Sequence, residues 1–422
     1  MIEFIGFGCI ASSVLLMQHV FKSDPVPGKI SRYFRNGGIA VKERNTKGEV
    51  TGIRFPKYKG KKAKNWGVEY TYTLPIGITY KMISEGMDEV FEAMLNKDVE
   101  TEELPHNQMK VTVYYERLPS LVKYETEWLE KCKGYKVVIG VDHKKMVFHD
   151  FDLIPHLIIG GMTRYGKSVV MKMLITQLVM RHQGVKFHLF DLKGGLAFNR
   201  FKKLPQVHSV ARDEMESLLS LRRLRNEIKK RQLYFEAKGY EDIKEAWKAG
   251  EFFHRDIIII DESSVLAPQS KSDQVRQECR SILEFIAQVA GGLGYNLIMC
   301  SQYPTGDILP RQVKQNSDAR LSFRLPTSTA SSVILDETGA EALPYGMKGR
   351  AIYKTDLKRM IQVPYMDNDM IDQLINPMKE SGKDDDHNPP KTNQPGTPNP
   401  PHTEEAGPSQ SLATTADSFF RY

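Results

Sequence analysis

Cysteine is scarce in this chain, and the few cysteines stand far apart. Four occur among 422 residues, with no Cys-x-x-Cys pair and no adjacent histidine partner. This spacing excludes a zinc site or a disulfide framework as the basis of the fold. We therefore expect the bulk of the chain to occupy a reducing compartment, the cytoplasm. The residues are Cys9, Cys132, Cys279 and Cys300.

A strong excess of one sign of charge is also lacking. The chain has 59 Lys and Arg against 52 Asp and Glu, a formal net charge of +7. Such a mild basic bias is compatible with a polyanionic partner or an anionic membrane surface, but it selects neither.

Long apolar runs are rare, and the one that stands out lies at the start, from Phe4 to Phe21. It is near the short end of the roughly 17 to 25 residues that cross a bilayer. Lys22 and three further basic residues follow, which predicts that the rest of the chain is cytoplasmic. No small-residue cleavage site follows it. We predict a membrane anchor over residues 1–22, single-pass or peripheral, with a signal-like segment or a buried helix as alternatives.

The next two segments differ in pattern. Residues 23–64 are rich in Lys, Arg, Gly and Pro and are predicted to be a basic linker, either merely solvated or in contact with phospholipid or DNA. Residues 65–135 contain two runs with strand-like alternation, beginning at Val68 and Met109, and a run with helical spacing from Tyr80 to Asn96. They predict a small α/β domain.

Residues 136–376 alternate long helical stretches with short runs that are apolar at nearly every position. The runs read HLIIGG, VKFHLFDLK, DIIIIDE, YNLIMCSQ and ARLSFRL. Continuous apolarity indicates burial on both faces, so we expect an α/β domain with a mostly parallel sheet covered by helices. Residues 377–422 are rich in Pro and polar residues and are predicted to be a disordered tail.

A phosphate-binding loop stands between the first of these strands and the following helix. Gly161-x-x-x-x-Gly166-Lys167-Ser168 matches this loop at every defined position. Its glycines let backbone N–H groups turn toward phosphates, Lys167 reaches the outer phosphates, and Ser168 ligates Mg²⁺. We assign ATP binding to nine consecutive residues: Gly161, Met162, Thr163, Arg164, Tyr165, Gly166, Lys167, Ser168 and Val169.

Acidic and polar residues follow two other strands. Asp261 and Glu262 come after four isoleucines, which places Asp261 near the magnesium ion and Glu262 near the attacking water. Gln302 ends a strand expected between the other two, where it senses the γ-phosphate or is only an exposed strand end. Asp191 and Lys193 stabilise the site, contact a neighbouring subunit or form a turn.

Arginines on the last apolar run are candidates for a catalytic contribution in trans. Arg320 and Arg324 lie in ARLSFRL, from where either could reach the nucleotide of the next subunit, or remain a surface strand residue. We assign the catalytic arginine to Arg320.

In order along the chain, PHLIIGGMTRYGKSVV, FDLKG, IIIIDES, GYNLIMCSQYPTGDIL, KQNSDARLSFRL and SSVILDETGAEALPYGMKGRAIY resemble the motor domain of the FtsK/SpoIIIE family of DNA translocases. The resemblance implies a RecA-like fold, a hexameric ring and ATP-driven pumping of double-stranded DNA. It also implies that Arg311 and Lys314 face the DNA channel.

The chain departs from the family pattern in three places. Ser332 stands where many members have an arginine, and Arg164 and Tyr165 are bulky for the phosphate loop. Chromosome-segregating members end in a winged-helix module that reads DNA sequence, and we expect the Pro-rich tail that follows the motor here to have no room for one. Family members that lack this module and carry a short membrane anchor resemble the coupling proteins of Gram-positive conjugative elements. This resemblance implies a relaxase and conjugation-channel proteins as partners. Segregation of a chromosome or plasmid, or protein secretion, remains the alternative.

Overall fold

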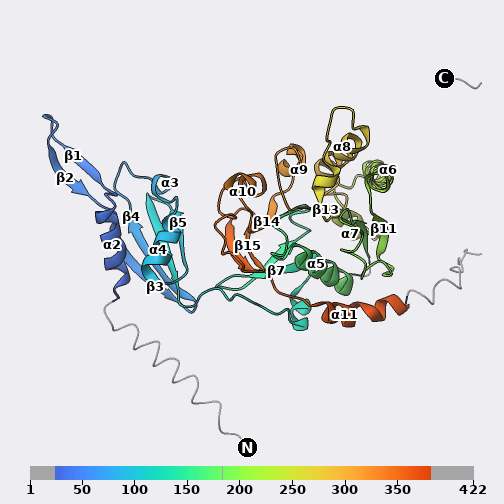
Figure 1. Cartoon of the computed structure of the whole chain (residues 1–422), viewed down its shortest axis with the longest axis horizontal. Helices are drawn as coiled ribbons and strands as arrows, with labels where there is room; N and C mark the ends of the chain where they lie inside the picture. The colour runs from blue at the N-terminus through green and yellow to red at the C-terminus, as the bar shows by residue number, and fades with distance from the viewer. Residues whose placement is uncertain (1–23, 183, 382–422) are drawn as a thin grey trace, which may run out of the picture.

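The structure, a computed structural model, describes residues 24–182 and 184–381. Figure 1 shows two bodies, a smaller one built from the N-terminal part and a larger one built from the rest. The predicted anchor, residues 1–22, lies outside the described residues, as does the tail from 382 onward. Within the described part, no helix has the length and apolarity needed to cross a bilayer.

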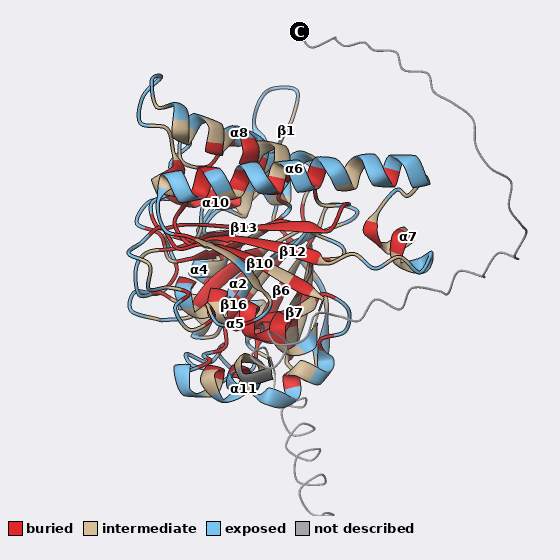
Figure 2. Ribbon diagram, turned by 90° about the vertical axis from the view of Figure 1, so that its right-hand side faces the viewer, coloured by how far each residue is buried: buried red, intermediate tan, exposed pale blue. Residues whose placement is uncertain are grey.

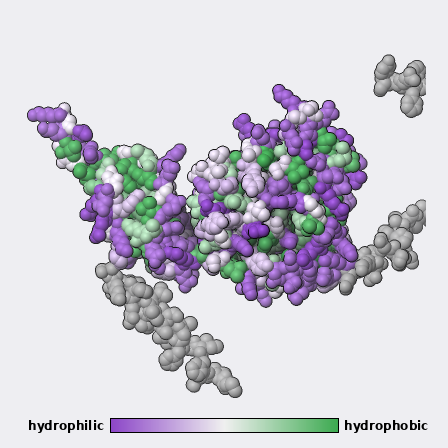
Figure 3. Space-filling view, viewed as in Figure 1, coloured by the Kyte–Doolittle hydropathy of each residue, from purple (hydrophilic) through white to green (hydrophobic). Residues whose placement is uncertain are grey.

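The small domain is an antiparallel sheet covered by helices. Its sheet has the order β3-β4-β6-β5, and a separate hairpin, β1–β2, extends from it. On the face shown in Figure 3, hydrophobic residues gather on this domain beside the hairpin. Phe34, Phe91 and Tyr72 pack edge to face in its core. The elements are α2 (Val26–Asn36), β1 (Val41–Arg44), β2 (Val50–Arg54), β3 (Lys57–Lys64), β4 (Gly67–Thr73), α3 (Tyr80–Ile83), α4 (Met87–Leu95), β5 (Val99–Leu104) and β6 (Gln108–Tyr114).

The prediction of a basic linker over residues 23–64 is wrong. Helix α2 buries Ile30 and Phe34, one turn apart, against the sheet, and β3 pairs with β4 along its length. The lysines of β3 lie on an edge strand, where most of them are exposed. A strand of this kind reads as a basic run because only its occasional inward residues, such as Tyr58, are apolar.

The larger domain is built on a ten-stranded mixed sheet, mostly parallel as predicted. Its order is β11-β10-β12-β13-β9-β14-β15-β16-β7-β8. The first six strands of this order, from β11 through β9 to β14, are parallel to one another. The remaining four strands continue the sheet with antiparallel pairing: β15, β16, β7 and β8. Their bounds are β7 (Lys136–Val141), β8 (Met146–Asp150), β9 (Leu157–Gly160), β10 (Val185–Phe190), β11 (Val207–Ala211), β12 (Arg255–Ile260), β13 (Tyr295–Ser301), β14 (Ala319–Phe323), β15 (Arg350–Lys354) and β16 (Lys358–Gln362).

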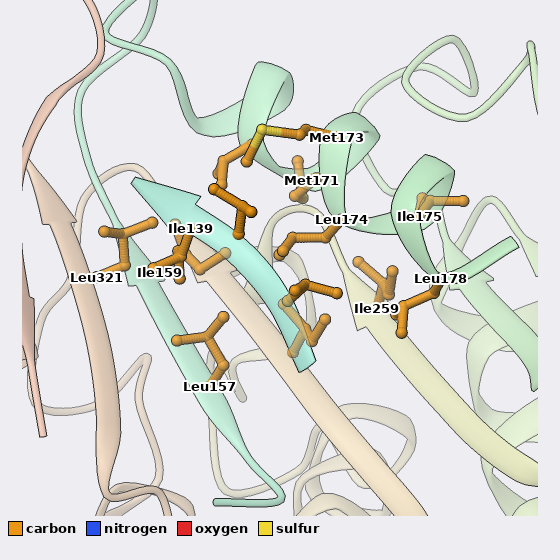
Figure 4. Packing of buried hydrophobic residues seen from close by; sticks show 14 of the residues in the cluster. Ile139, Leu157, Ile159, Met171, Met173, Leu174, Ile175, Leu178, Ile259 and Leu321 are labelled. Atoms are coloured by element: carbon orange, nitrogen blue, oxygen red, sulfur yellow. The ribbon is translucent and has the colours of Figure 1, made fainter. Parts of the chain in front are cut away.

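Helices cover both faces of this sheet, as Figure 2 shows with α6, α8 and α10 on one side and α5 and α11 on the other. Successive strand residues therefore enter opposite cores: Ile259 packs with α5, whereas Ile258 and Ile260 pack toward α6 and α8. Figure 4 shows Ile259 beside Leu178 of α5, and Ile159 beside Leu321 of β14. The remaining elements are η1 (Thr126–Lys131), α5 (Lys167–Arg181), α6 (Glu214–Lys238), α7 (Ile243–Lys248), η2 (Ser263–Leu266), α8 (Gln274–Val289), α9 (Arg311–Gln315), α10 (Ser328–Leu335) and α11 (Asn368–Ser381).

Two domain boundaries differ from the predicted ones. Tyr124 and Trp128, assigned above to the small domain, are buried in the same core as α5. Helix α11 runs through Pro377 to Ser381, so the tail does not begin at residue 377. The fully buried Ile371 and Ile375 hold this helix on the larger domain.

Candidate nucleotide-binding site

The phosphate loop joins β9 to α5 and is shaped by its glycines. Gly161 has a φ of 156° and Gly166 a φ of 128°, values that other residues rarely adopt. Phe323 of β14 lies directly against both: a Cβ atom would stand 2.7 Å from the Phe323 Cβ at Gly161 and 2.8 Å from its Cε1 at Gly166. The loop thus follows the ring closely, which leaves no space for a side chain at either position.

Lys167, at the first position of α5, is buried against the acidic residue predicted to activate water. Its Nζ lies 3.3 Å from Oε2 of Glu262, and both side chains are less than a tenth exposed. The other oxygen of Glu262 accepts hydrogen bonds from the Gln302 backbone N–H at 3.3 Å and from the Ser264 hydroxyl at 2.9 Å. The structure therefore brings together Lys167, Glu262 and Gln302, which follow three separate strands in the sequence.

The side chain of Gln302 links the loop to a neighbouring strand end. Its Oε1 accepts a hydrogen bond from the Thr163 hydroxyl at 3.0 Å and another from Lys193 Nζ at 2.7 Å. Lys193 was predicted to stabilise the site, to contact a neighbouring subunit or to form a turn. Its position beside Gln302 favours the first of these interpretations.

Asp261 is buried beside other acidic groups. Its Oδ1 accepts a hydrogen bond from the Leu192 N–H at 2.9 Å. Burial, together with the nearby Asp191 and Glu262 carboxylates, nevertheless raises its pKa to about 6, although that hydrogen bond and Lys167 lower it. A bound cation would reverse this balance by favouring the carboxylate form.

Three buried oxygens at the carboxyl ends of the neighbouring strands have no hydrogen-bond partner among the residues that the structure describes. They are Oδ1 of Asp191 after β10, Oγ of Ser263 after β12 and Oγ of Ser301 in β13. Unsatisfied buried oxygens are uncommon, and a ligand that brings donors or a hydrated cation would satisfy these three. Magnesium prefers oxygen ligands and keeps several waters, so this set of residues fits it.

The bulky residues of the loop have different surroundings. Tyr165 is turned inward, 8% exposed, and belongs to the core under α5. Its hydroxyl accepts a hydrogen bond from the Gly346 N–H at 3.3 Å and its carbonyl one from the Gly349 N–H at 2.8 Å. Arg164 is exposed, with a φ of 70°.

The segment that contacts Tyr165, residues 343–349, was missed as part of the site. The only signal was its pair of glycines within the motif LPYGMKG.

Arg320 is not brought to this site. Its guanidinium forms an ion pair with Asp336 and donates to the carbonyls of Lys314 at 3.0 Å and Ser317 at 3.3 Å. It pairs in register with Ile158, near the start of β9, at the strand end opposite to the loop. Its action on a neighbouring subunit stays a prediction, and so do the DNA contacts of Arg311 and Lys314.

A strand, a glycine-rich loop and a helix that begins with lysine, next to an Asp-Glu pair on a parallel strand, define a P-loop ATPase. The comparisons with known proteins narrow this class. The family model described as "FtsK/SpoIIIE family" matches residues 124–342, which is more than half of the chain, and the chain belongs to this family.

Curated relatives and solved structures agree with this assignment. The DNA translocase FtsK of Leptospira interrogans is 30% identical over 60% of this chain and 28% of its own length. The DNA translocase SpoIIIE of Bacillus subtilis is 26% identical over 64% of this chain and 36% of its own length. The chain thus spans about a third of these relatives.

Two solved structures share the fold. The conjugation coupling protein TcpA of pCW3, solved as a monomer with ATPγS, has a TM-score of 0.59 at 22% identity, over 84% of this chain and 99% of that chain. The type VII secretion ATPase EccC of Thermomonospora curvata has a TM-score of 0.51 at 22% identity, over 58% of this chain and 31% of that chain.

Proposed function

We propose that this chain is an ATP-hydrolysing DNA translocase. The observation that carries the proposal is the convergence of Lys167, Glu262 and Gln302 at the end of the phosphate loop. This set can bind a triphosphate and activate water, and the family relatives are named as DNA translocases.

The contacts of Glu262 suggest how binding prepares hydrolysis. Lys167 is paired with Glu262 in the structure. The phosphates compete for this lysine, and when it turns to them, one oxygen of Glu262 becomes available to accept a proton from water. Gln302 then lies beside both the loop and Glu262, where it orients the water or senses the terminal phosphate.

Magnesium is the expected cofactor. Ser168 and Asp261 would hold the ion, which would supply positive charge against the negative charge that develops on the phosphate oxygens. Asp261 is fixed for this task by the Leu192 N–H, while the unpartnered oxygens of Asp191 and Ser301 offer further hydrogen-bond acceptors to coordinated water.

Within the family, we assign the chain to conjugation, as the coupling protein that delivers DNA to a transfer channel. The fold likeness to TcpA supports this, because it includes the small domain as well as the motor. A hexameric ring, partners such as a relaxase and channel proteins, and attachment to the cell membrane with the motor in the cytoplasm belong to the same proposal. Segregation is the alternative within the translocases.

A second candidate is energising protein secretion, favoured by the fold shared with EccC. The likeness covers only 58% of this chain, so the small domain contributes less to the argument than it does for TcpA.

The test is ATP turnover of the purified chain with and without linear double-stranded DNA. We expect DNA to raise turnover severalfold. Lys167→Ala should abolish nucleotide binding. Glu262→Gln should retain binding and lower turnover by roughly 10² to 10⁴, the usual contribution of a general base. If neither double- nor single-stranded DNA changes the rate of ATP turnover, a DNA motor is excluded. Stimulation by a secreted protein alone would favour secretion.

A further inference from the structure

The two flanks of the phosphate loop differ in chemistry. Strand β9 lies between β13 and β14. Glu262 and Gln302, the groups suited to the reacting phosphate, follow β12 and β13 and so lie on one flank. A triphosphate held by this loop with its terminal phosphate beside Glu262 therefore directs its nucleoside toward the other flank, where β14 and β15 lie (Figure 1).

The segment Pro344–Gly349 lies on that flank. Three hydrogen bonds hold this segment and the end of β14 against the phosphate loop. Tyr165 accepts from Gly346 through its hydroxyl and from Gly349 through its carbonyl. Met162, the second residue of the loop, donates its N–H to the Arg324 carbonyl at the end of β14, at 3.0 Å. Residues far apart in sequence are thus held next to the loop as one unit.

This unit presents one large aromatic ring to solvent. Tyr345 is 87% exposed. The Arg324 guanidinium lies 6.0 Å from the ring centroid and donates to the carbonyl of Leu343, so it supports the turn that carries the ring. An exposed ring held at the edge of a phosphate site has the shape and electronic character to stack on a purine or pyrimidine base.

We propose that Tyr345 stacks on the base of the bound nucleoside triphosphate, with Arg324 as its positioning residue. This inference deepens the proposed function and rests on it, since the ligand is the nucleotide that the phosphate loop holds. Stacking tolerates different bases, so the contact contributes affinity for a nucleoside rather than selection of adenine.

The test compares a ligand that has a base with one that lacks it. Binding of ATPγS and of inorganic tripolyphosphate, each with Mg²⁺, is measured by calorimetry on the full chain and on Tyr345→Ala. We expect Tyr345→Ala to weaken ATPγS about tenfold, as typical for the loss of one base stack, and to leave tripolyphosphate unchanged. Tyr345→Phe should keep wild-type affinity for both. Tyr115→Ala, a half-exposed tyrosine in the small domain, is the matched control.

The outcomes separate the inference from the proposed function. Unchanged ATPγS affinity in Tyr345→Ala, or an equal loss for both ligands, would overturn base stacking, because the ring would then be irrelevant or merely structural. Failure of the wild-type chain to bind either ligand, or of Lys167→Ala to reduce binding, would instead overturn the nucleotide site itself.

Discussion

At the scale of single residues, Asp261 gives the site a dependence on pH. Its pKa is raised to about 6 by burial and by the carboxylates of Asp191 and Glu262. A carboxyl group binds a metal ion only when it is deprotonated, so the Mg²⁺ affinity that we propose for Asp261 should be full above this pKa and fall as the pH drops below it. We expect kcat/KM for ATP to decline below about pH 6.

The measurement is kcat/KM between pH 5 and pH 8 at several magnesium concentrations. Because metal and proton compete for one carboxylate, higher Mg²⁺ should move the acidic limb to lower pH. If the decline of kcat/KM at acidic pH does not depend on the magnesium concentration, another titrating group causes it.

The same residues show what sequence reasoning could reach. Asp261, Glu262 and Gln302 were predictable, because the carboxyl ends of parallel strands meet at one edge of a sheet. The inward direction of Tyr165 and the pairing of Lys193 with Gln302 were not, since each depends on segments distant in sequence. The roles of all of these residues in catalysis stay predictions.

At the scale of elements, helix α10 packs so closely on β9 that it dictates a glycine. A Cβ atom at Gly160 would lie 2.6 Å from Cγ1 of Ile334, and the three nearest atoms all belong to Ile334. Gly160→Ala should cost about 1–3 kcal/mol through overpacking, and Ile334→Ala about 2–5 kcal/mol through the cavity it leaves. The double variant should cost less than the sum, because the new methyl enters that cavity.

Chemical denaturation of the four proteins measures this coupling. Gly166→Ala with Phe323→Ala serves as the matched control: removing the ring makes space, but the φ of 128° remains unfavourable, so the rescue should be smaller than at Gly160 and Ile334. Strict additivity at Gly160 and Ile334 would show that α10 does not hold this distance.

The elements also differ in how well their sequences predicted them. The five runs read as buried strands are β9, β10, β12, β13 and β14, because burial on both faces makes them continuously apolar. The antiparallel strand β16 and the edge strand β3 were not predicted, since each mixes charged residues with few inward apolar ones. Helix α2 escaped for the same reason. Strand β15 was also not predicted: its three middle residues are buried, but a charged residue stands at each end.

At the scale of the whole molecule, the turn between β7 and β8 connects the two domains. Nε2 of His143 lies 2.7 Å from Oδ2 of Asp98, and its ring stacks on Tyr114 with centroids 3.8 Å apart. Lys144 lies 3.1 Å from Glu100 and 5.0 Å from the ring centroid of Trp66. The small domain has its own core, so these contacts govern its placement rather than its folding.

The double variant His143→Ala, Lys144→Ala should therefore release the small domain while both domains remain folded. Loss of the stacked ring and of the two contacts with carboxylates should raise the undocked population about tenfold, which corresponds to 1.4 kcal/mol. Limited proteolysis in the connecting residues 115–123 reports this population when cleavage is slower than redocking.

Lys145→Ala, an exposed lysine on the same turn, is the matched control and should be cleaved like the wild type. Equal cleavage of the double variant and the wild type would show that the turn does not hold the domains together.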